Sequence, residues 1–455
     1  MLAVVVSRSD TASVHIGDHL LDLVEWREHQ DGTRPDGAGG GTVYRRDGIE
    51  LRTVDAIHLD LDGVAEGFGT VDDGPDREPA LLAFASRHAG ETGPLLTAHH
   101  TGNFGPAEFG GADGTLARAC PNAQQRAFEA LDEHAPEGYE VGLECTHHGP
   151  SDVGVPSLFV EVGSDDAQWD DPAAARAVAQ SILALDGVDA DTPRENGARR
   201  HLVGFGGGHY VPRFERVVRE TDWAIGHIGA DWALDAMGEP AEHADVIEQA
   251  FTESAAEYAL LEADRPGLCE TIETLGYRVV DETWVRETSG VPLGLVERLE
   301  ATIATIDDGL RFGAPATGFD GEFVVESVGT ELLARANGID REATRAAVAD
   351  TAVAFGTEQN GTEVVGPIAL VDPDDHETIV DALGDVLRQS YDSVERDGDT
   401  IVARETAFDP ALARDLGVPE GPAFGQLSAG NAVEIDGTQI TPDEVTREQI
   451  DEFPV

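Results

Sequence analysis

Short apolar runs alternate with longer amphipathic stretches through most of this 455-residue chain. Alternating strands and helices bury a sheet between helices, so the pattern favours an α/β fold. We expect a mixed, largely parallel sheet with flanking helices. The predicted strands are Leu2–Val6, Ala56–Leu61, Pro94–Ala98, Glu140–Cys145, Pro156–Val162, His201–Phe205 and Trp223–Ile228. The predicted helices are Asn122–Glu133, Pro172–Leu185 and Ala241–Leu261, and two Gly-, Asp- and Pro-rich segments, 30–42 and 62–78, are expected to be surface loops.

The pattern changes near Gly290. Of the 15 histidines, 14 precede this residue and only His376 follows it. Imidazole chemistry therefore belongs to the first part of the chain. We predict a catalytic domain over residues 1–289 and a smaller α+β region over residues 290–455.

The charge balance is strongly acidic, with 88 Asp and Glu against 30 basic residues, all of them Arg. Without lysine the chain has no Schiff-base lysine and no P-loop. The net charge of −58 is spread along the whole sequence. Such a surface suits a halophilic cytoplasm, because molar salt shortens the Debye length to about 3 Å. The chain has no secretory signal and no apolar run of the ~20 residues that a membrane span needs, so we expect a cytoplasmic protein without a membrane partner.

Four groups of polar residues follow or end predicted strands: Thr97–Asn103, Glu144–Pro150, Val203–Arg213 and Gly226–Gly229. Ligands of open α/β sheets collect at the carboxyl ends of strands. Histidines at several such ends are therefore expected to meet in one crevice. Zinc or general acid–base chemistry would explain them, whereas hydrogen-bonded strand ends are the plainer alternative for each group alone.

On an unbroken strand, Glu144 and His148 would share a face and His147 would point away. The glycines Gly206–Gly208 would let backbone amides approach an anion or a metal-bound water, although a flexible hairpin would look similar. His227 is expected to be a hydrogen-bonded strand-end histidine. Six arginines and only two acids lie between Arg194 and Arg219, which indicates either phosphate clamps or ordinary surface ion pairs.

The groups together closely resemble the archaeal and plant type of D-aminoacyl-tRNA deacylase. The resemblance spans about residues 1–280 and is carried by Ser7-Arg8, Thr-Ala-His-His-Thr-Gly-Asn (97–103), Glu-Cys-Thr-His-His-Gly-Pro (144–150) and Gly-Gly-Gly-His-Tyr-Val-Pro-Arg (206–213). It implies a zinc-dependent esterase, with two zinc ions per subunit, that removes D-amino acids from mischarged tRNA. It also implies a phosphorylase/hydrolase-like fold related to peptidyl-tRNA hydrolase.

The segment Leu416–Leu427, with Gly437 and Ile440–Pro442, is similar to a segment near the C-terminus of the tRNA 3′-processing metallo-hydrolases. Their His-x-His-x-Asp-His motif is absent here, so their activity does not carry over. The segment is either a shared tRNA-end element or a turn-rich strand pair.

These observations lead to a set of candidate residues. The metal ligands are His99, His148 and His209, and the general base is Glu144 or His147. The substrate-binding residues are His100, Asn103, Gly206, Gly207, Gly208, Arg199, Arg200 and Arg213. We expect a monomer that takes D-aminoacyl-tRNA and no DNA. A zinc amidase or peptidase of small substrates, a tRNA-binding protein with structural zinc, and catalysis by the ribose hydroxyl remain alternatives.

Overall fold

A computed structural model describes residues 1–70 and 78–455, so part of the predicted loop 62–78 lies outside the described residues. The chain divides into two compact units, Met1–Ser289 and Gly290–Val455. Each unit has its own apolar core. Among the described residues, none of the helices has both the length and the apolar character that crossing a membrane requires.

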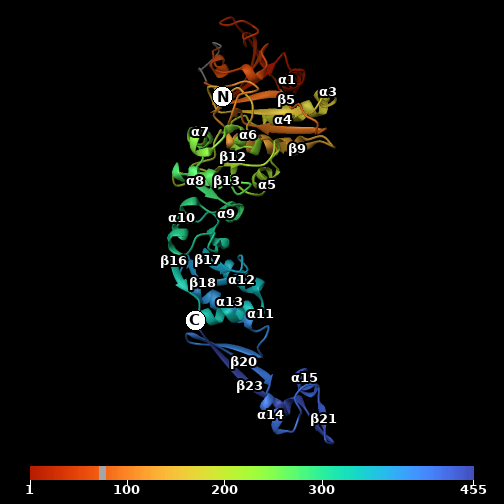
Figure 1. Cartoon of the computed structure of the whole chain (residues 1–455), viewed down its shortest axis with the longest axis vertical. Helices are drawn as coiled ribbons and strands as arrows, with labels where there is room; N and C mark the ends of the chain where they lie inside the picture. Colours follow the sequence, from red (N-terminus) through yellow and green to blue (C-terminus); the bar gives the residue numbers. More distant parts are fainter. Residues whose placement is uncertain (71–77) are drawn as a thin grey trace. The chain divides into compact units, whose positions relative to one another are not determined.

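The first unit is built on an eight-stranded sheet with the order β2-β3-β4-β1-β5-β10-β6-β9. Figure 1 labels two of these strands, β5 and β9. The pairings β4–β1, β1–β5, β5–β10 and β6–β9 are parallel, and the other three are antiparallel. The predicted mixed, largely parallel sheet is therefore confirmed. Its strands are β1 (Leu2–Ser7), β2 (Arg27–Asp31), β3 (Gly41–Arg46), β4 (Ile49–Val54), β5 (Leu81–Arg87), β6 (Leu95–His99), β9 (Glu140–Leu143) and β10 (Ser157–Gly163).

Three helices lie side by side against this sheet: α1 (Thr11–Leu23), α4 (Pro172–Leu183) and α2 (Pro121–His134). Helix α4 begins as the sequence predicts, because the Asp171 side chain accepts the Ala173 N–H and proline occupies the first turn. A short helix, α3 (Asp166–Trp169), precedes α4. The helices cover the central strands, whose residues are almost all buried and mostly apolar.

A second, fully parallel sheet follows in the chain, with the order β12-β11-β13-β14. Its elements are β11 (His201–Phe205), α5 (Pro212–Glu220), β12 (Ala224–Gly229), α6 (Asp231–Met237), α7 (Ala244–Ser254), β13 (Tyr258–Leu261), α8 (Pro266–Thr274), β14 (Arg278–Val280) and α9 (Glu282–Glu287). The two sheets meet where the chain leaves β9, since Glu144 bridges to Tyr210 and Thr146 N–H donates to Ile228 O. A two-stranded ribbon, β7 (Gly102–Asn103) and β8 (Thr115–Leu116), lies in the loop after β6.

Two sequence predictions for the first unit were wrong. Ala56–Leu61 is a loop with a single 3₁₀ turn at His58–Asp60, and the strand of this region is β4. Ala241–Leu261 is a helix only to Ser254, after which β13 begins. Apolar runs such as Tyr258–Leu261 fit a helix or a strand equally well, and pairing with β11 and β14 decides the outcome.

The second unit has an antiparallel sheet with the order β15-β17-β18-β16, covered by helices. A hairpin with a third strand and a small helix-and-hairpin end complete it. The predicted α+β character is thus present. Within the segment singled out in the sequence, Leu416–Leu427 leads into α15, whereas Gly437 and Ile440 lie in the hairpin of β21 and β22. The elements are α10 (Leu293–Thr302), β15 (Leu310–Phe312), β16 (Val324–Ser327), α11 (Thr330–Ile339), α12 (Arg341–Ala349), β17 (Ala354–Glu358), β18 (Glu363–Leu370), α13 (Asp375–Leu387), β19 (Ser393–Asp397), β20 (Thr400–Phe408), α14 (Pro410–Asp415), α15 (Pro422–Ser428), β21 (Val433–Ile435), β22 (Thr438–Ile440) and β23 (Thr446–Pro454).

Candidate functional site

Four segments that are distant in the sequence meet at the junction of the two sheets. His88 directly follows β5, and His99 is the last residue of β6. The loop after β9 carries Glu144 to His148, and the loop after β11 carries His209 and Tyr210. The hydrogen bond from Cys145 N–H to His209 O, 2.9 Å long, joins the last two segments.

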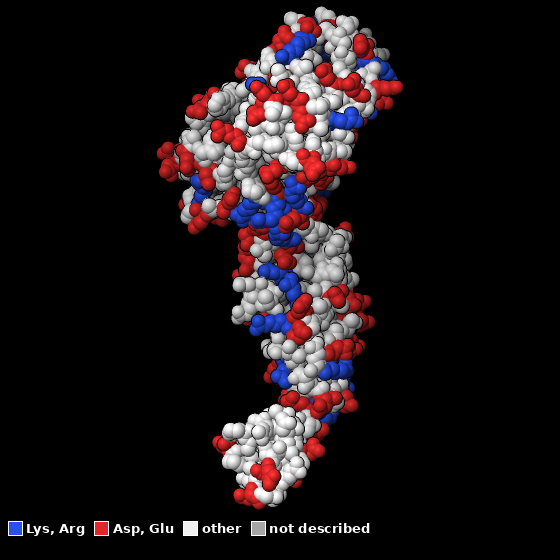
Figure 2. All heavy atoms as spheres, turned by 90° about the vertical axis from the view of Figure 1, so that its right-hand side faces the viewer, with Lys and Arg blue, Asp and Glu red and all other residues white. Residues whose placement is uncertain are grey.

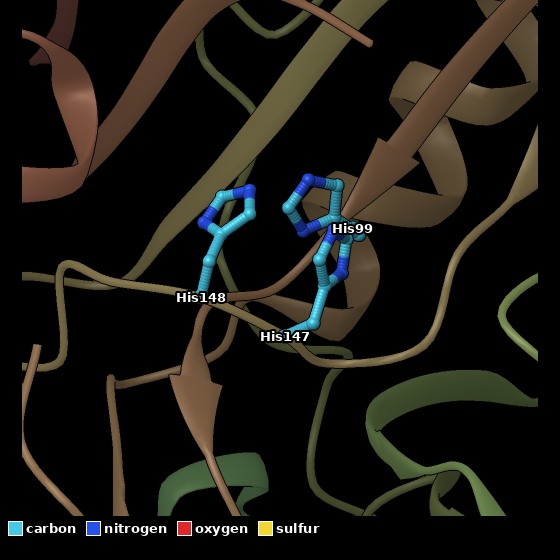
Figure 3. Close-up of side chains that lie close together, drawn as sticks. All are labelled: His99, His147 and His148. Atoms are coloured by element: carbon cyan, nitrogen blue, oxygen red, sulfur yellow. The ribbon is translucent and has the colours of Figure 1, made fainter. Parts of the chain in front are cut away.

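His99, His147 and His148 form a group of three imidazoles, which we call the histidine trio (Figure 3). The Nδ1 atoms of the trio lie 3.0, 2.8 and 2.7 Å from the carbonyl oxygens of His100, Cys145 and Gly149, in that order. A carbonyl oxygen can only accept, so each Nδ1 carries a proton, and Nε2 keeps its lone pair wherever the ring is neutral. This is how metal-binding histidines are oriented in proteins.

The surroundings of the trio favour a cation. Its three ligand atoms lie within 4.8 Å of one another. Burial lowers the pKa of His147 well below the ordinary value and that of His148 to about 3. Both rings are therefore neutral near pH 7 and can offer a nitrogen lone pair to a metal ion. The Nε2 of His99 is buried without a hydrogen-bond partner among the described residues. Burial acts to lower the pKa of His99, but Glu161, with its Oε1 3.7 Å away, outweighs it and raises the pKa.

Glu144 is the hub of the remaining site. Its side chain is fully buried, and its Oε2 lies 2.6 Å from His209 Nε2 and 3.7 Å from His147 Nε2. Its Oε1 lies 3.1 Å from His88 Nδ1. Burial acts to raise the pKa of Glu144, but the hydrogen bonds to His209 and His88 outweigh it and hold the pKa well below the ordinary range. Glu144 is therefore an ionised carboxylate, and His88, Glu144 and His209 form a second set that could hold a metal.

His88 connects Glu144 to a further residue, because its Nε2 lies 2.8 Å from the Tyr210 hydroxyl. Burial acts to lower the pKa of His88, but the effect of Glu144 is larger and raises this pKa. The carboxylate of Glu161, which is buried in β10, approaches His88 Nδ1 to 3.8 Å. Burial raises the pKa of Glu161.

The site opens into a cavity of about 340 Å³. Its wall includes His147, His148 and His209, together with Glu161 from β10 and Phe109 from the loop after β7. The volume lies at the lower end of the range of small-molecule pockets, which is about 300–1,000 Å³. The arrangement combines free imidazole nitrogens, an ionised carboxylate and room for a small reacting group, as a hydrolytic site requires.

Comparisons with known proteins identify the family. The model of a family described as D-aminoacyl-tRNA deacylase matches residues 76–280. A D-aminoacyl-tRNA deacylase of Haloarcula marismortui is 57% identical over 454 residues, covering 99% of both chains. The chain belongs to the D-aminoacyl-tRNA deacylase family. A D-aminoacyl-tRNA deacylase of Halorubrum lacusprofundi is 53% identical, and the match covers 100% of this chain and 97% of the relative. One of Methanoregula boonei is 32% identical, and the match covers 98% of this chain and 96% of the relative.

A crystal structure of a conserved protein of unknown function matches with a TM-score of 0.54 and 29% sequence identity. The match covers 64% of this chain and 98% of that chain. The extra third of the present chain is therefore not part of that fold, whereas the haloarchaeal deacylases match over nearly the full length.

The structure corrects the expected geometry of the Glu144 loop in this deacylase-family chain. Strand β9 ends at Leu143, and the chain then turns through His148, whose φ is +49°. Because the strand does not run on, the expected shared face of Glu144 and His148 does not exist. His147 therefore joins His99 and His148, while His209 contacts Glu144. His147 also lies beside His209, with ring centroids 4.5 Å apart. The roles predicted for these residues stay predictions.

His100 and Asn103 lie behind the cavity wall. His100 accepts the Cys120 N–H through Nε2 and faces Gly226 O through Nδ1, so both ring nitrogens are bonded. Asn103 Nδ2 donates to Gly110 O and Ala112 O. Their predicted contacts with substrate stay predictions. His227 is the hydrogen-bonded structural histidine expected from the sequence, since its nitrogens reach Thr146 Oγ1 and Ala117 O.

The glycines and arginines of the predicted binding set also lie outside the cavity wall. The Gly206 N–H donates to Gly229 O. Added Cβ atoms at Gly206 and Gly207 would meet Glu262, so the backbone of these two glycines packs closely against Glu262. Each of the three arginines already has partners within the protein. Arg199 contacts Asp191 and Thr192 O. Arg200 contacts Glu195, Asp222 and Thr288 O, and Arg213 contacts Glu282 and Leu261 O. Phosphate binding by these three stays a prediction.

The sequence reasoning missed His88, Glu161 and Tyr210. Strand β5 was not predicted, although Leu81–Ala85 is an apolar run and His88 follows it as His99 follows β6. The signal for Glu161 was a lone acid in the middle of the apolar strand β10, which is costly unless it has partners.

Proposed function

We propose that this protein hydrolyses the ester bond between a D-amino acid and the terminal ribose of tRNA, in the cytoplasm. The names of its full-length relatives support this activity. The observation that carries it is the histidine trio beside the Glu144–His209 pair, with His147, His148 and His209 in the wall of one cavity.

We propose zinc as the metal and His99, His147 and His148 as the residues that hold it. Imidazole nitrogen is a preferred zinc ligand, and the buried, unpartnered His99 Nε2 needs such a partner. When bound, zinc polarises an ester carbonyl and makes water more acidic. A second ion, as the family resemblance implies, would need His88, Glu144 and His209 as ligands, which is the alternative to a role of His209 as the base. His99, His148 and His209, the ligands first expected, are thus divided between the two sets.

The proton of the attacking water is assigned to His209. Its Nε2–H donates to the ionised Glu144, and this hydrogen bond leaves Nδ1 as the free base. Glu144 itself is a weak base because its pKa is held low, so it orients His209 and stabilises the imidazolium that forms. In this scheme His209 is the base and Glu144 orients it. His209 could not act as the base while it held a second metal ion together with His88 and Glu144.

Arginines near the site would hold the acceptor end of the tRNA. Figure 2 shows acidic side chains spread over the face in view, with arginines gathered in a few places. On α5 and α9, Arg213, Arg216 and Arg286 gather around Glu282, and Arg286 also contacts Glu220. Helix α5 begins three residues after His209. A guanidinium can bind phosphate through short-range hydrogen bonds that molar salt screens less than long-range attraction.

The test is release of labelled D- or L-tyrosine from charged tRNA in molar salt, with and without a chelator. We expect release of the D-form alone, loss of release after chelation and recovery with added zinc. Turnover of small D-aminoacyl esters with no preference for tRNA would favour a zinc amidase or esterase. Binding of tRNA without turnover would make the metal structural, and unchanged turnover by metal-free protein would favour the ribose hydroxyl.

A further inference from the structure

Phe109 is the most exposed of the large hydrophobic side chains in the described part of the chain, with 67% of its surface accessible. Exposing a phenyl ring to water costs free energy that burial would recover. The ring also lies in the wall of the catalytic cavity, together with His147, His148 and His209. Aromatic side chains in the wall of a cavity commonly contact the ligand that the cavity takes.

The backbone beneath this ring is held firmly. Phe109 O accepts the Gly149 N–H at 2.9 Å, which ties it to the residue after His148. Asn103 Nδ2 donates to Gly110 O and Ala112 O, and Ser151 Oγ accepts the Ala112 N–H. An added Cβ on Gly149 would lie only 2.3 Å from Gly111 N, so the two loops are in close contact. Phe109 is therefore fixed relative to the trio rather than carried by a free loop.

The size of the cavity decides which part of a charged tRNA reaches Phe109. With about 340 Å³, the cavity holds the reacting end of the substrate and little more. The group attached to the reacting ribose is the terminal adenine, which must then lie at the cavity edge. Aromatic rings at such positions bind unpaired bases by stacking.

We infer that the Phe109 ring is the stacking platform for the terminal adenine of the charged tRNA. The inference rests on the proposed function. Stacking suits this chain, because phosphate contacts lose affinity at high salt, whereas base–aromatic contact does not depend on charge. It also gives Asn103 a role, since this residue holds the Phe109 loop through its hydrogen bonds to Gly110 O and Ala112 O.

The experiment measures KM for D-tyrosyl-tRNA and for the same tRNA with an abasic terminal nucleotide, both charged chemically. Phe109→Ala should raise KM for the intact tRNA roughly tenfold, as expected for one lost base stack. The abasic end should raise KM of the unchanged protein by a similar factor. The two changes together should cost no more than either alone, because they remove the same contact.

Two further variants are matched controls. Phe109→Trp should keep the KM near that of the unchanged protein, since an indole also stacks. Trp232→Ala removes an aromatic ring that is 51% exposed on α6, outside the cavity wall, and should leave KM unchanged.

The inference would be overturned if the two factors by which Phe109→Ala and the abasic end raise KM multiplied when the changes were combined. An unchanged KM for Phe109→Ala would overturn it as well. An equal loss with a small D-tyrosine ester would assign the ring to the amino acid instead. Failure of the proposed function is distinguishable, because the unchanged protein would then not release D-tyrosine from intact tRNA.

Discussion

The two units of this chain both have buried apolar cores, but in the part of the chain that the structure describes only the first unit gathers histidines and carboxylates into a site. The first unit brings four loops that follow strands to one place and fills it with histidines and two buried carboxylates. The second unit has an equally buried apolar core but only His376, which is half-buried and lies beside Ser327 O. Parallel strands end at the same edge of a sheet, and the parallel pair β6 and β9 therefore brings His99 and the Glu144 loop together. Strand β5 runs in the opposite direction to this pair, and His88 at its end reaches Glu144 from that side. The antiparallel sheet of the second unit brings no such set of histidines together among the described residues.

The largest expected effect is on the reaction itself. His209→Gln should lower kcat by about 10²- to 10⁴-fold, because it removes the proposed base, while the zinc content stays unchanged. His376→Gln, in the second unit, should leave both unchanged. The measurements are single-turnover release of D-tyrosine and metal analysis of the purified variants. Loss of zinc with His209→Gln would place this residue among the ligands instead.

The next effect separates the stabilities of the two units. Phe355 is fully buried in β17 of the second unit, and Phe355→Ala should cost about 3–5 kcal/mol. All five tryptophans lie in the first unit, so tryptophan fluorescence follows that unit alone, whereas circular dichroism follows both. Denaturation of Phe355→Ala in molar salt should shift the dichroism transition and leave the fluorescence midpoint in place.

Phe251→Ala, in the core of the first unit, is the matched variant and should shift the fluorescence midpoint. If Phe355→Ala moved both signals together, the two units would unfold as one and the comparison between them would fail.

A smaller effect follows from buried histidines of the first unit. Burial lowers the pKa of His201 and of His227 to about 4. Between pH 6.5 and 4 the unfolded chain binds protons that the folded chain refuses, so their stabilisation is present above pH 6.5 and is lost as the pH falls towards 4. The fluorescence midpoint should therefore fall between pH 7 and pH 5, more steeply than any second-unit transition. His201→Gln should flatten this dependence, and an unchanged slope would contradict the assignment.

The smallest effect tests where tRNA binds. Arg216→Gln and Arg286→Gln should each raise KM for D-tyrosyl-tRNA a few-fold, because a single phosphate contact contributes little at molar salt. Arg404→Gln, on β20 of the second unit, is the control and should have no effect. A larger rise for Arg404→Gln would move the tRNA-binding surface to the second unit.

Much of the first unit was predictable because its signals are local. Apolar runs bounded by turn residues indicate β1, β6, β10 and β11, and the cap Asp171 with Pro172 indicates the start of α4. Strand β13 was assigned to a helix because a short apolar run carries no period of its own. Its strand state comes from its pairing with β11 and β14, which a local pattern does not contain.

By itself, the sequence predicted that His99, Glu144, His147, His148 and His209 meet in one crevice, because each ends or follows a predicted strand of an α/β sheet. Only the tertiary structure decided how they are divided. The trio depends on the turn at His148 and on three carbonyls that fix its Nδ1 atoms, while His88 and His209 reach Glu144 from other strands. Which ring nitrogen is free is set by the direction of hydrogen bonds between segments far apart in the chain, and no local pattern encodes that direction.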